Sequence, residues 1–255
     1  MALQVASLGS GPDLVLLHGW GFNNAVWQAL LPLLTPHWSV HLIDLPGHGA
    51  NVAVPLMETI AAVAQQIITV APPRAHYLGW SLGGTLAMAI ALQHHHRMDK
   101  LILVSSTPRF ITAEGWPHGV DAAIFQQFGY DLINNYSATL HRFLMLQSLG
   151  NGPARQRAHQ LQQQLATYPQ PSSTTLARGL RLLEEVDFRD DINQICAPTL
   201  MIHSNNDKLV PLSAAQFLHQ QIPQSRLSLF ESSGHIPFIH QPEQVATEIN
   251  QFLYE

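Results

Sequence analysis

Cysteine and charge are both scarce in this sequence. Among its 255 residues there is one cysteine, Cys196, and only 11% of the residues are charged. A single cysteine excludes an intrachain disulfide, which fits a protein of a reducing compartment. Because Cys196 stands just before an apolar stretch, we expect it to be a small buried side chain rather than a reactive thiol.

Long hydrophobic runs and an excess of positive charge are missing as well. No apolar stretch reaches the ~18 residues of a membrane span, and the first residues lack the basic region and apolar core of a secretory signal. The net charge of −5 argues against a general nucleic-acid binder. We expect a cytoplasmic protein that acts as a monomer, with neither a membrane nor a nucleic-acid partner.

Histidine, in contrast, is abundant, with 15 residues that include the run His94–His96. This run stands at the end of a predicted helix, where positive charge is tolerated. No acidic or cysteine side chain stands at ligand spacing from it in the sequence, so we expect no metal site there.

Short apolar runs alternate with longer helical patterns along the chain. Runs rich in Leu, Val and Ile that are separated by helices predict a mostly parallel sheet with helices on both faces. The predicted strands are Leu14–Leu17, Val40–Ile43, His76–Leu78, Leu101–Val104, Thr199–His203 and Leu227–Phe230. The predicted helices are Ala25–Leu34, Thr59–Val70, Leu82–Gln93, Ser213–Gln221 and Pro242–Leu253.

The alternation stops between residues 108 and 186. This stretch shows helical patterns only, with turns predicted at Gly150–Pro153 and Pro169–Pro171. We predict an α/β core of residues 1–107 and 187–255, into which residues 108–186 are inserted as a helical cap that forms one structural unit with it. Ligands of open α/β sheets bind at the carboxyl ends of the strands, where we expect the cap to lie.

A G-x-S-x-G motif runs from Gly79 to Gly83 and places Ser81 between a predicted strand and a predicted helix. On such a sharp turn the serine hydroxyl is exposed at the positive end of the helix. The glycines suit a place where strand and helix pass too closely for a Cβ. The context favours Ser81 as a nucleophile over a chance match in a glycine-containing turn.

A serine nucleophile needs a base, and an acid that orients the base. Asp207 follows the predicted strand Thr199–His203, and His235 follows the strand Leu227–Phe230. Both therefore stand in loops at the strand edge that carries Ser81, in the order Ser, Asp, His expected for such a site. The competitors fit less well, because they precede their strand or lie further from its end: Asp187, Asp190, Asp191 and His240.

A fourth part of the site follows the first predicted strand, in the segment Leu16–Gly21. A backbone N–H of this loop and that of the residue after the nucleophile can hold a developing oxyanion. The candidates are Trp20 and Leu82, both acting through the main chain. We expect His18 to brace the loop rather than to take part in the chemistry.

The chain resembles the α/β-hydrolase superfamily over nearly its whole length. The matching segments are Leu16–Gly21, Asp44–Gly49, Gly79–Gly84, Asp207 and Gly234–His235. Within the superfamily it is most similar to the carboxylesterases of biotin synthesis that cleave the methyl ester of pimeloyl-acyl-carrier protein, as judged from His18–Gly21, Gly79–Gly84 and Arg142–Gln147. The resemblance implies a Ser-His-Asp esterase that forms an acyl-enzyme, releases methanol and needs no cofactor or metal.

The resemblance also implies which residues line the substrate site. They are Phe143, Leu144, Met145, Leu146 and Gln147 of the cap, together with Trp20, Ser81, Leu82 and His235. We expect an acyl tunnel to which Trp80, Phe110 and Trp116 contribute as well. One departure from the family pattern is Ser204-Asn205-Asn206, which stands where relatives often carry a glycine before the aspartate.

Residues 132–183 contain arginines but no aspartate or glutamate, so the predicted cap is locally basic. Such a patch favours an anionic partner. In the related esterases the cap takes the acidic acyl carrier protein, and we expect Arg142, Arg155 and Arg157 to dock it. Ala138 and His159 are substitutions at cap positions where the family expects a basic residue. A solvated helical face with no partner is the alternative.

Two other functions stay open. A general short-chain carboxylesterase or thioesterase would use the same site on small soluble esters, and a hydrolase-like ligand receptor would use it for binding alone. Dehalogenases on this fold carry aspartate in place of Ser81. A lyase of menaquinone synthesis is also similar, but that family tends to place arginine where this chain has Thr85.

Overall fold

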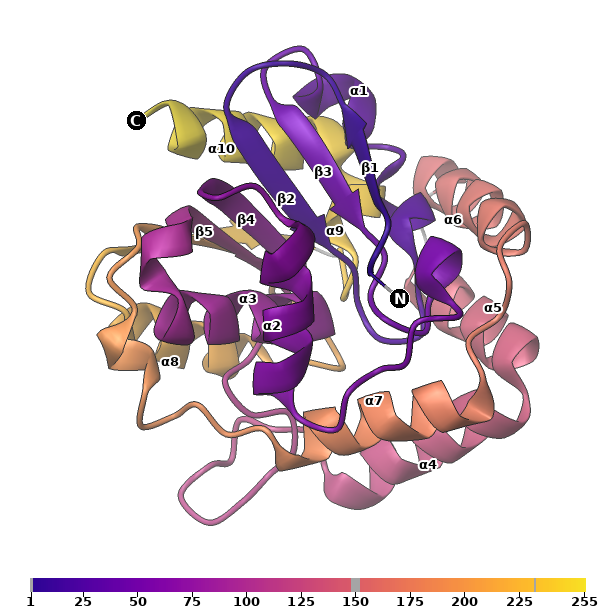
Figure 1. Ribbon diagram of the computed structural model, residues 1–255. Coiled ribbons are helices and arrows are strands. Elements are labelled where there is room, and N and C mark those ends of the chain that lie inside the picture. The colour runs from indigo at the N-terminus through magenta and orange to yellow at the C-terminus, as the bar shows by residue number, and fades with distance from the viewer. Residues whose placement is uncertain (1, 148–151, 232) are drawn as a thin grey trace.

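A seven-stranded sheet forms the centre of the molecule (Figure 1). The computed structural model describes residues 2–147, 152–231 and 233–255, without the side chains of Leu146, Gln147 and Ala154. The strands have the order β1-β3-β2-β4-β5-β6-β7, and β1 is antiparallel to β3 while the other pairs are parallel. Their bounds are Val5–Leu8 (β1), Asp13–Leu17 (β2), Ser39–Ile43 (β3), Ala75–Trp80 (β4), Met98–Val104 (β5), Thr199–Ser204 (β6) and Ser225–Phe230 (β7).

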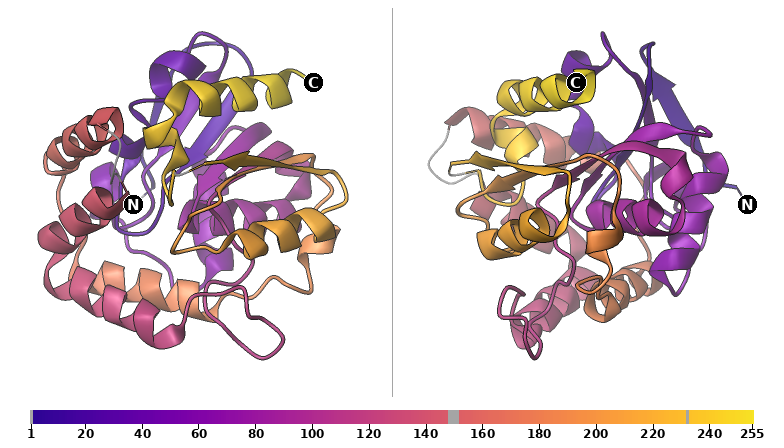
Figure 2. Two further views of the ribbon diagram at one scale, coloured as in Figure 1. Left: turned by 180° about the vertical axis from the view of Figure 1, so that it is seen from behind. Right: turned by 90° about the vertical axis from the view of Figure 1, so that its left-hand side faces the viewer.

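Both faces of the sheet are covered by helices, because alternate side chains of the central strands enter two separate cores. Val15 and Leu17 of β2 pack toward helices α2 (Ile60–Val70), α3 (Leu82–Gln93) and α8 (Leu212–Gln221). Leu14 and Leu16 enter the other core. The helices on that face, α1 (Leu31–Leu34) and α10 (Pro242–Tyr254), are seen from behind in Figure 2.

All six predicted strands are present. The central ones are largely buried apolar runs, whereas β7 at the sheet edge has one fully buried residue, Phe230. Strand β1 was not predicted, because it is short and mostly exposed. The predicted helix over residues 25–34 is wrong: a 3-10 turn, η1 (Asn24–Trp27), is followed by the separate helix α1. Pro32 explains the break, since inside one continuous helix it would remove a hydrogen bond and clash with the preceding turn.

Helices α4 (Ala122–Asn134), α5 (Tyr136–Gln147), α6 (Gly152–Leu165) and α7 (Ser173–Glu185) form the cap. Figure 1 shows them at the end of the sheet toward which the arrowheads of β2 and β3 point. Residues 108–121 before them are not helical, against the expectation of helices only. They form an irregular loop with isolated bridges between Ile111 and Val120 and between Ala113 and Trp116.

The remaining short elements are η2 (Gly49–Asn51), η3 (His95–Arg97), η4 (Ile192–Gln194) and α9 (Pro237–His240). Cys196 follows η4 and is exposed, so its prediction as a buried side chain is wrong. The apolar residues around it enter the core while Cys196 itself faces outward. No helix in the described ranges is long and apolar enough to cross a membrane.

Candidate active site

Ser81 occupies the turn between β4 and α3, and its backbone is strained. Its φ of 55° and ψ of −118° place a non-glycine residue in a region that side chains rarely adopt. Such strain persists only where the surroundings fix it. Here the Ser81 N–H donates to the carbonyl of Val104, and the Ser81 carbonyl accepts from Gly84. The serine is thereby held at the amino end of the 12-residue helix α3.

The glycines of the motif are needed because the backbone is crowded. A Cβ at Gly79 would overlap the carbonyl of Gly83, and one at Gly83 would overlap the carbonyl of Leu17 on β2. The α3 helix therefore starts in direct contact with two strands. Leu82 is its first residue, so its N–H has no partner within the helix and remains suited to an oxyanion.

Asp207 and His235 form a buried pair at the ends of β6 and β7. The Asp207 Oδ2 lies 2.8 Å from the Nδ1 of His235, and the other oxygen, Oδ1, accepts from the N–H groups of Leu209 and Val210. Burial alone would raise the pKa of Asp207, but the facing His235 and the Val210 N–H hold it below its ordinary value. Asp207 thus stays ionised and fixes His235 with Nδ1 as the donor.

The loop that carries Trp20 lies beside Ser81. A Cβ on Gly19 would come within 3.3 Å of the Ser81 Cβ. His18 braces this loop from within: its Nδ1 lies 2.9 Å from the Gly19 carbonyl, and its Nε2 accepts from the Leu45 N–H. Burial lowers the pKa of His18 to about 4, so it is neutral at neutral pH, as both bonds require.

A second buried histidine, His48, supports the same loop. Its Nε2 accepts from the Gly21 N–H at 3.3 Å, and its Nδ1 lies 3.0 Å from the Pro46 carbonyl. Burial, with the neighbouring His18, lowers its pKa to about 3. The segment Asp44–Gly49, which the sequence marked only as a family match, is therefore a support for the oxyanion loop.

The cap holds this loop from the opposite side. The Trp20 indole donates to the Leu176 carbonyl on α7, and the Tyr136 hydroxyl of α5 donates to the Gly21 carbonyl at 2.8 Å. Gly179 leaves room for the indole, since a Cβ there would lie 2.5 Å from its Cδ1. None of these cap residues was predicted, because contacts across more than 100 residues leave no local signal in the sequence.

Ser81 and His235 line one cavity of about 30 Å³ between the core and the cap. Its walls are almost wholly apolar, and aromatic rings dominate them. The predicted Trp20, Trp80, Phe110 and Phe143 line it, and Phe22, Phe125 and Phe128, which were not predicted, do so as well. This is a site for an uncharged, apolar chain next to a serine hydroxyl.

Other residues predicted for substrate contact lie elsewhere. Leu144 is buried in the core and Met145 packs against it, and neither lines the cavity. A helix turns by about 100° per residue, so α5 presents Phe143 to the cavity and its two successors to other faces. Trp116 packs against Phe217 instead. The side chains of Leu146 and Gln147 lie outside the described part of the structure.

The three arginines predicted for carrier docking have different surroundings. Arg142 and Arg155 are exposed on the cap, and Arg142 lies 3.9 Å from Asp131. Arg157 is partly buried, and its guanidinium donates to the carbonyls of Ile239 and His240 at the end of α9. Arg157 therefore joins the cap to the core, a contact that the sequence did not predict.

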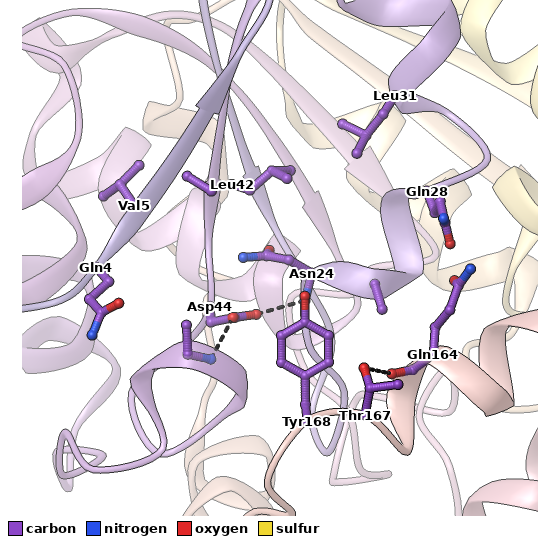
Figure 3. A pocket seen from close by; sticks show the side chains of 13 residues that line it. Gln4, Val5, Asn24, Gln28, Leu31, Leu42, Asp44, Gln164, Thr167 and Tyr168 are labelled. Atoms are coloured by element: carbon purple, nitrogen blue, oxygen red, sulfur yellow. Dashed lines mark hydrogen bonds between the residues drawn. The ribbon is translucent and has the colours of Figure 1, made fainter.

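A second and larger cavity, of about 400 Å³, opens between η1, β1 and the end of α6. Asp44 and Tyr168 both line it, and Figure 3 shows the Tyr168 ring extending from the cap toward Asp44 and Asn24. Among the residues that line it there is neither a serine nor a histidine. The Asp44 carboxylate accepts from the N–H groups of Asn24 and Ala50. Of these two cavities, the one at Ser81 brings a serine and a histidine together, and we take it as the candidate active site.

The parallel sheet, the strained serine between β4 and α3, and the Asp207–His235 pair at the following strand ends together define an α/β hydrolase. The family model described as alpha/beta hydrolase fold matches residues 12–242, and the chain belongs to this family.

Two relatives with the same name are similar to this chain over nearly its whole length. The chain is 39% identical over 250 residues to the pimeloyl-[acyl-carrier protein] methyl ester esterase of Vibrio campbellii, with 98% of each chain covered. It is 41% identical over 245 residues to the protein of the same name from Photobacterium profundum, with 96% of each covered. Among solved structures, an esterase from Exiguobacterium antarcticum matches with a TM-score of 0.87 and 26% identity, covering 99% of this chain and 96% of that one.

Proposed function

We propose that this protein is a carboxylesterase that hydrolyses the methyl ester of pimeloyl-acyl-carrier protein, as the printed names of its relatives state for them. The observation that carries the proposal is the strained Ser81 in the same apolar cavity as His235, which is hydrogen-bonded to the buried Asp207. The reaction would serve biotin synthesis and leave the acid on its carrier.

In the proposed reaction the Ser81 hydroxyl attacks the ester carbonyl while His235 takes its proton through Nε2. The N–H groups of Trp20 and Leu82 stabilise the oxyanion of the tetrahedral intermediate. His235 then protonates the departing methoxide, which leaves as methanol. Water, deprotonated by His235, attacks the acyl-enzyme and releases the free carboxylic acid. Every proton moves through His235, and Asp207 keeps its ring oriented.

The apolar walls of the cavity fit this substrate at its methyl ester end. A free carboxylate among Phe22, Phe125 and Phe143 would lose its hydration without gaining a charged partner, since none of the lining residues is Lys or Arg. The neutral ester suffers no such penalty. We infer that the site prefers the esterified chain to its acid product, which favours product release.

The carrier itself would bind outside the cavity, on the cap. Arg142 and Arg155 are exposed there, in a stretch without acidic residues from 132 to 183. Positive side chains on the cap favour encounter with an acidic protein. Arg157 is engaged with α9 and supports the cap in this proposal, in addition to any contact with the carrier.

The decisive test compares two substrates that share the ester but differ in the carrier. The kcat/KM for the methyl ester of pimeloyl-acyl-carrier protein is measured beside that for dimethyl pimelate. We expect a clear preference for the carrier-linked ester. Equal values would show a general esterase instead, and loss of activity on both substrates and on p-nitrophenyl butyrate would leave only a ligand-binding role.

A further inference from the structure

The loop that carries the acid and the loop that carries the base are joined by side chains that the triad does not include. We call residues 204–207 the acid loop and residues 233–235 the base loop. The Oδ1 of Asn206 accepts from the Gly234 N–H at 2.9 Å, and the Oγ of Ser204 accepts from the Ser233 N–H at 3.0 Å. Two successive amides of the base loop are thus bound by two side chains of the acid loop.

The two acceptors also support each other. The Ser204 hydroxyl donates to the Asn206 Oδ1 at 2.7 Å, which leaves the amide oxygen directed at the base loop. Ser204 is fully buried at the end of β6, whereas Asn206 stands at the surface. A residue without a side-chain acceptor at position 204 or 206 would lose one of these two bonds to the base loop.

The main chain around His235 is held from both directions as a result. Gly234 has a φ of 56°, a conformation that suits glycine and that aims its N–H at Asn206. On the other side, the Trp80 indole donates to the His235 carbonyl at 2.8 Å. With the backbone fixed before and after it, the imidazole has little freedom apart from rotation of its own side chain.

We propose that Asn206, together with Ser204, is a positioning residue that keeps the Nδ1 of His235 within hydrogen-bonding distance of the Oδ2 of Asp207. Asn206 touches neither substrate nor reacting atoms; it acts through the Gly234 amide. The proposal rests on the proposed role of His235 as the general base. The bonds made by Ser204 and Asn206 are therefore a second link between the acid loop and the base loop, in addition to the bond of 2.8 Å between Asp207 and His235.

The test uses the intact protein with three substitutions, to which Ser204→Ala is added below as a fourth. Asn206→Ala removes the acceptor at an exposed site without opening the core. Asn206→Asp restores an oxygen in the same place. The matched control is Asn193→Ala, at an exposed asparagine in η4 that lies outside both loops. The readouts are kcat and KM for p-nitrophenyl butyrate, the pH profile of kcat/KM, and the downfield proton resonance of the His235 Nδ1–H.

We expect Asn206→Ala to lower kcat by about three- to tenfold, the factor that one lost hydrogen bond costs, with KM little changed. The Nδ1–H resonance should broaden or shift at the same time. Asn206→Asp should recover most of the turnover, because its carboxylate oxygen can accept from the Gly234 N–H as the amide oxygen does. Asn193→Ala should behave like the wild type.

An Asn206→Ala protein with the wild-type kcat, pH profile and Nδ1–H resonance would overturn the proposal. So would an equal loss in Asn193→Ala, which would indicate a general effect on folding. If the wild type hydrolyses no ester, the proposed function fails, but the resonance still reports the Asp207–His235 bond. Ser204→Ala then tests the same link independently, since it leaves the Ser233 N–H without its acceptor. An unchanged Nδ1–H resonance in both Asn206→Ala and Ser204→Ala would refute the positioning role.

Discussion

The indole Nε1 of Trp20 donates a hydrogen bond of 3.1 Å to the main-chain carbonyl of Leu176, at a sequence separation of 156 residues. One partner belongs to the loop beside Ser81 and the other to cap helix α7. Any displacement of α7 therefore moves the main chain whose N–H is proposed to stabilise the oxyanion. The cap therefore helps to position the loop beside Ser81, in addition to covering the cavity.

Gly179→Ala tests this connection. The new Cβ would lie 2.5 Å from the Trp20 Cδ1 and 2.6 Å from its Nε1, so the indole has to move. Alanine favours a helix by roughly 1 kcal/mol over glycine, but overpacking costs about 1 to 3 kcal/mol. We expect a net loss of stability in urea unfolding and a fall in kcat of about tenfold or more, because misplaced catalytic groups are costly.

Gly152→Ala is the matched control, since it lies on cap helix α6 and, among the described residues other than its chain neighbours, no atom comes within 4 Å of the added Cβ. It should keep both kcat and stability. A Gly179→Ala protein that matches it in both measurements would show that the Trp20 side chain does not position the oxyanion loop.

Ser81→Ala should abolish ester hydrolysis. Losing the nucleophile of such a triad lowers turnover by about 10⁶. The variant should remain folded, because the Ser81 backbone bonds to Val104 and Gly84 do not involve its hydroxyl. Measurement of p-nitrophenyl butyrate hydrolysis with a pure sample, next to a thermal melt, separates loss of chemistry from loss of fold. Substantial residual turnover would remove Ser81 from the mechanism.

Acidification should destabilise the protein well above the pKa of its carboxylates. His18 and His48 have pKa values of about 4 and about 3 in the folded state, below the ordinary 6.5. The unfolded chain binds protons first, so the stability they contribute is complete above pH 6.5 and is lost as pH falls toward 4. Between pH 7 and 5 the two together should cost about 3 to 4 kcal/mol of unfolding free energy.

Urea unfolding at pH 7, 6 and 5 measures this dependence. His48→Gln should reduce the slope by the share of that one histidine, whereas His96→Gln, at an exposed side chain, should leave it unchanged. Burial also lowers the pKa of His203, which adds to the same slope. Burial raises the pKa of Asp44, which opposes the trend without reversing it. Stability that is flat over this range would mean that the two buried histidines accept protons in the folded state.

Reversing charge on the cap should separate carrier binding from chemistry. Arg142→Glu with Arg155→Glu should raise KM for the carrier-linked methyl ester about five- to tenfold at low salt, because like charges then face the acidic partner. Dimethyl pimelate should be hydrolysed as before. Arg74→Glu, on an exposed side chain before β4, is the control. Equal effects on both substrates would exclude the cap arginines as a docking surface.

The sequence was most informative where function depends on local geometry. The turn at Ser81 has a recognisable glycine pattern, and Asp207 and His235 directly follow apolar strands, so their common edge follows from parallel pairing. The hydrogen bonds that join Tyr136 and Leu176 to the oxyanion loop were not predictable, because they depend on how the cap packs over the core. The prediction of Leu144 and Met145 as substrate contacts has the same limit. The motif indicates a helical segment near the substrate, but the packing of the helix determines which of its faces lines the cavity.

The cavity at Ser81 has a volume of about 30 Å³, room for about two water molecules. The proposed pimeloyl chain is several times larger, so we expect it to enter only after aromatic side chains such as Phe128 and Phe143 have separated from Trp20 and Phe22. Each catalytic cycle would then include an opening of the protein that is independent of bond making. Friction with the solvent acts on that opening, and added glycerol or sucrose should slow turnover in proportion to viscosity wherever the opening is the slowest step.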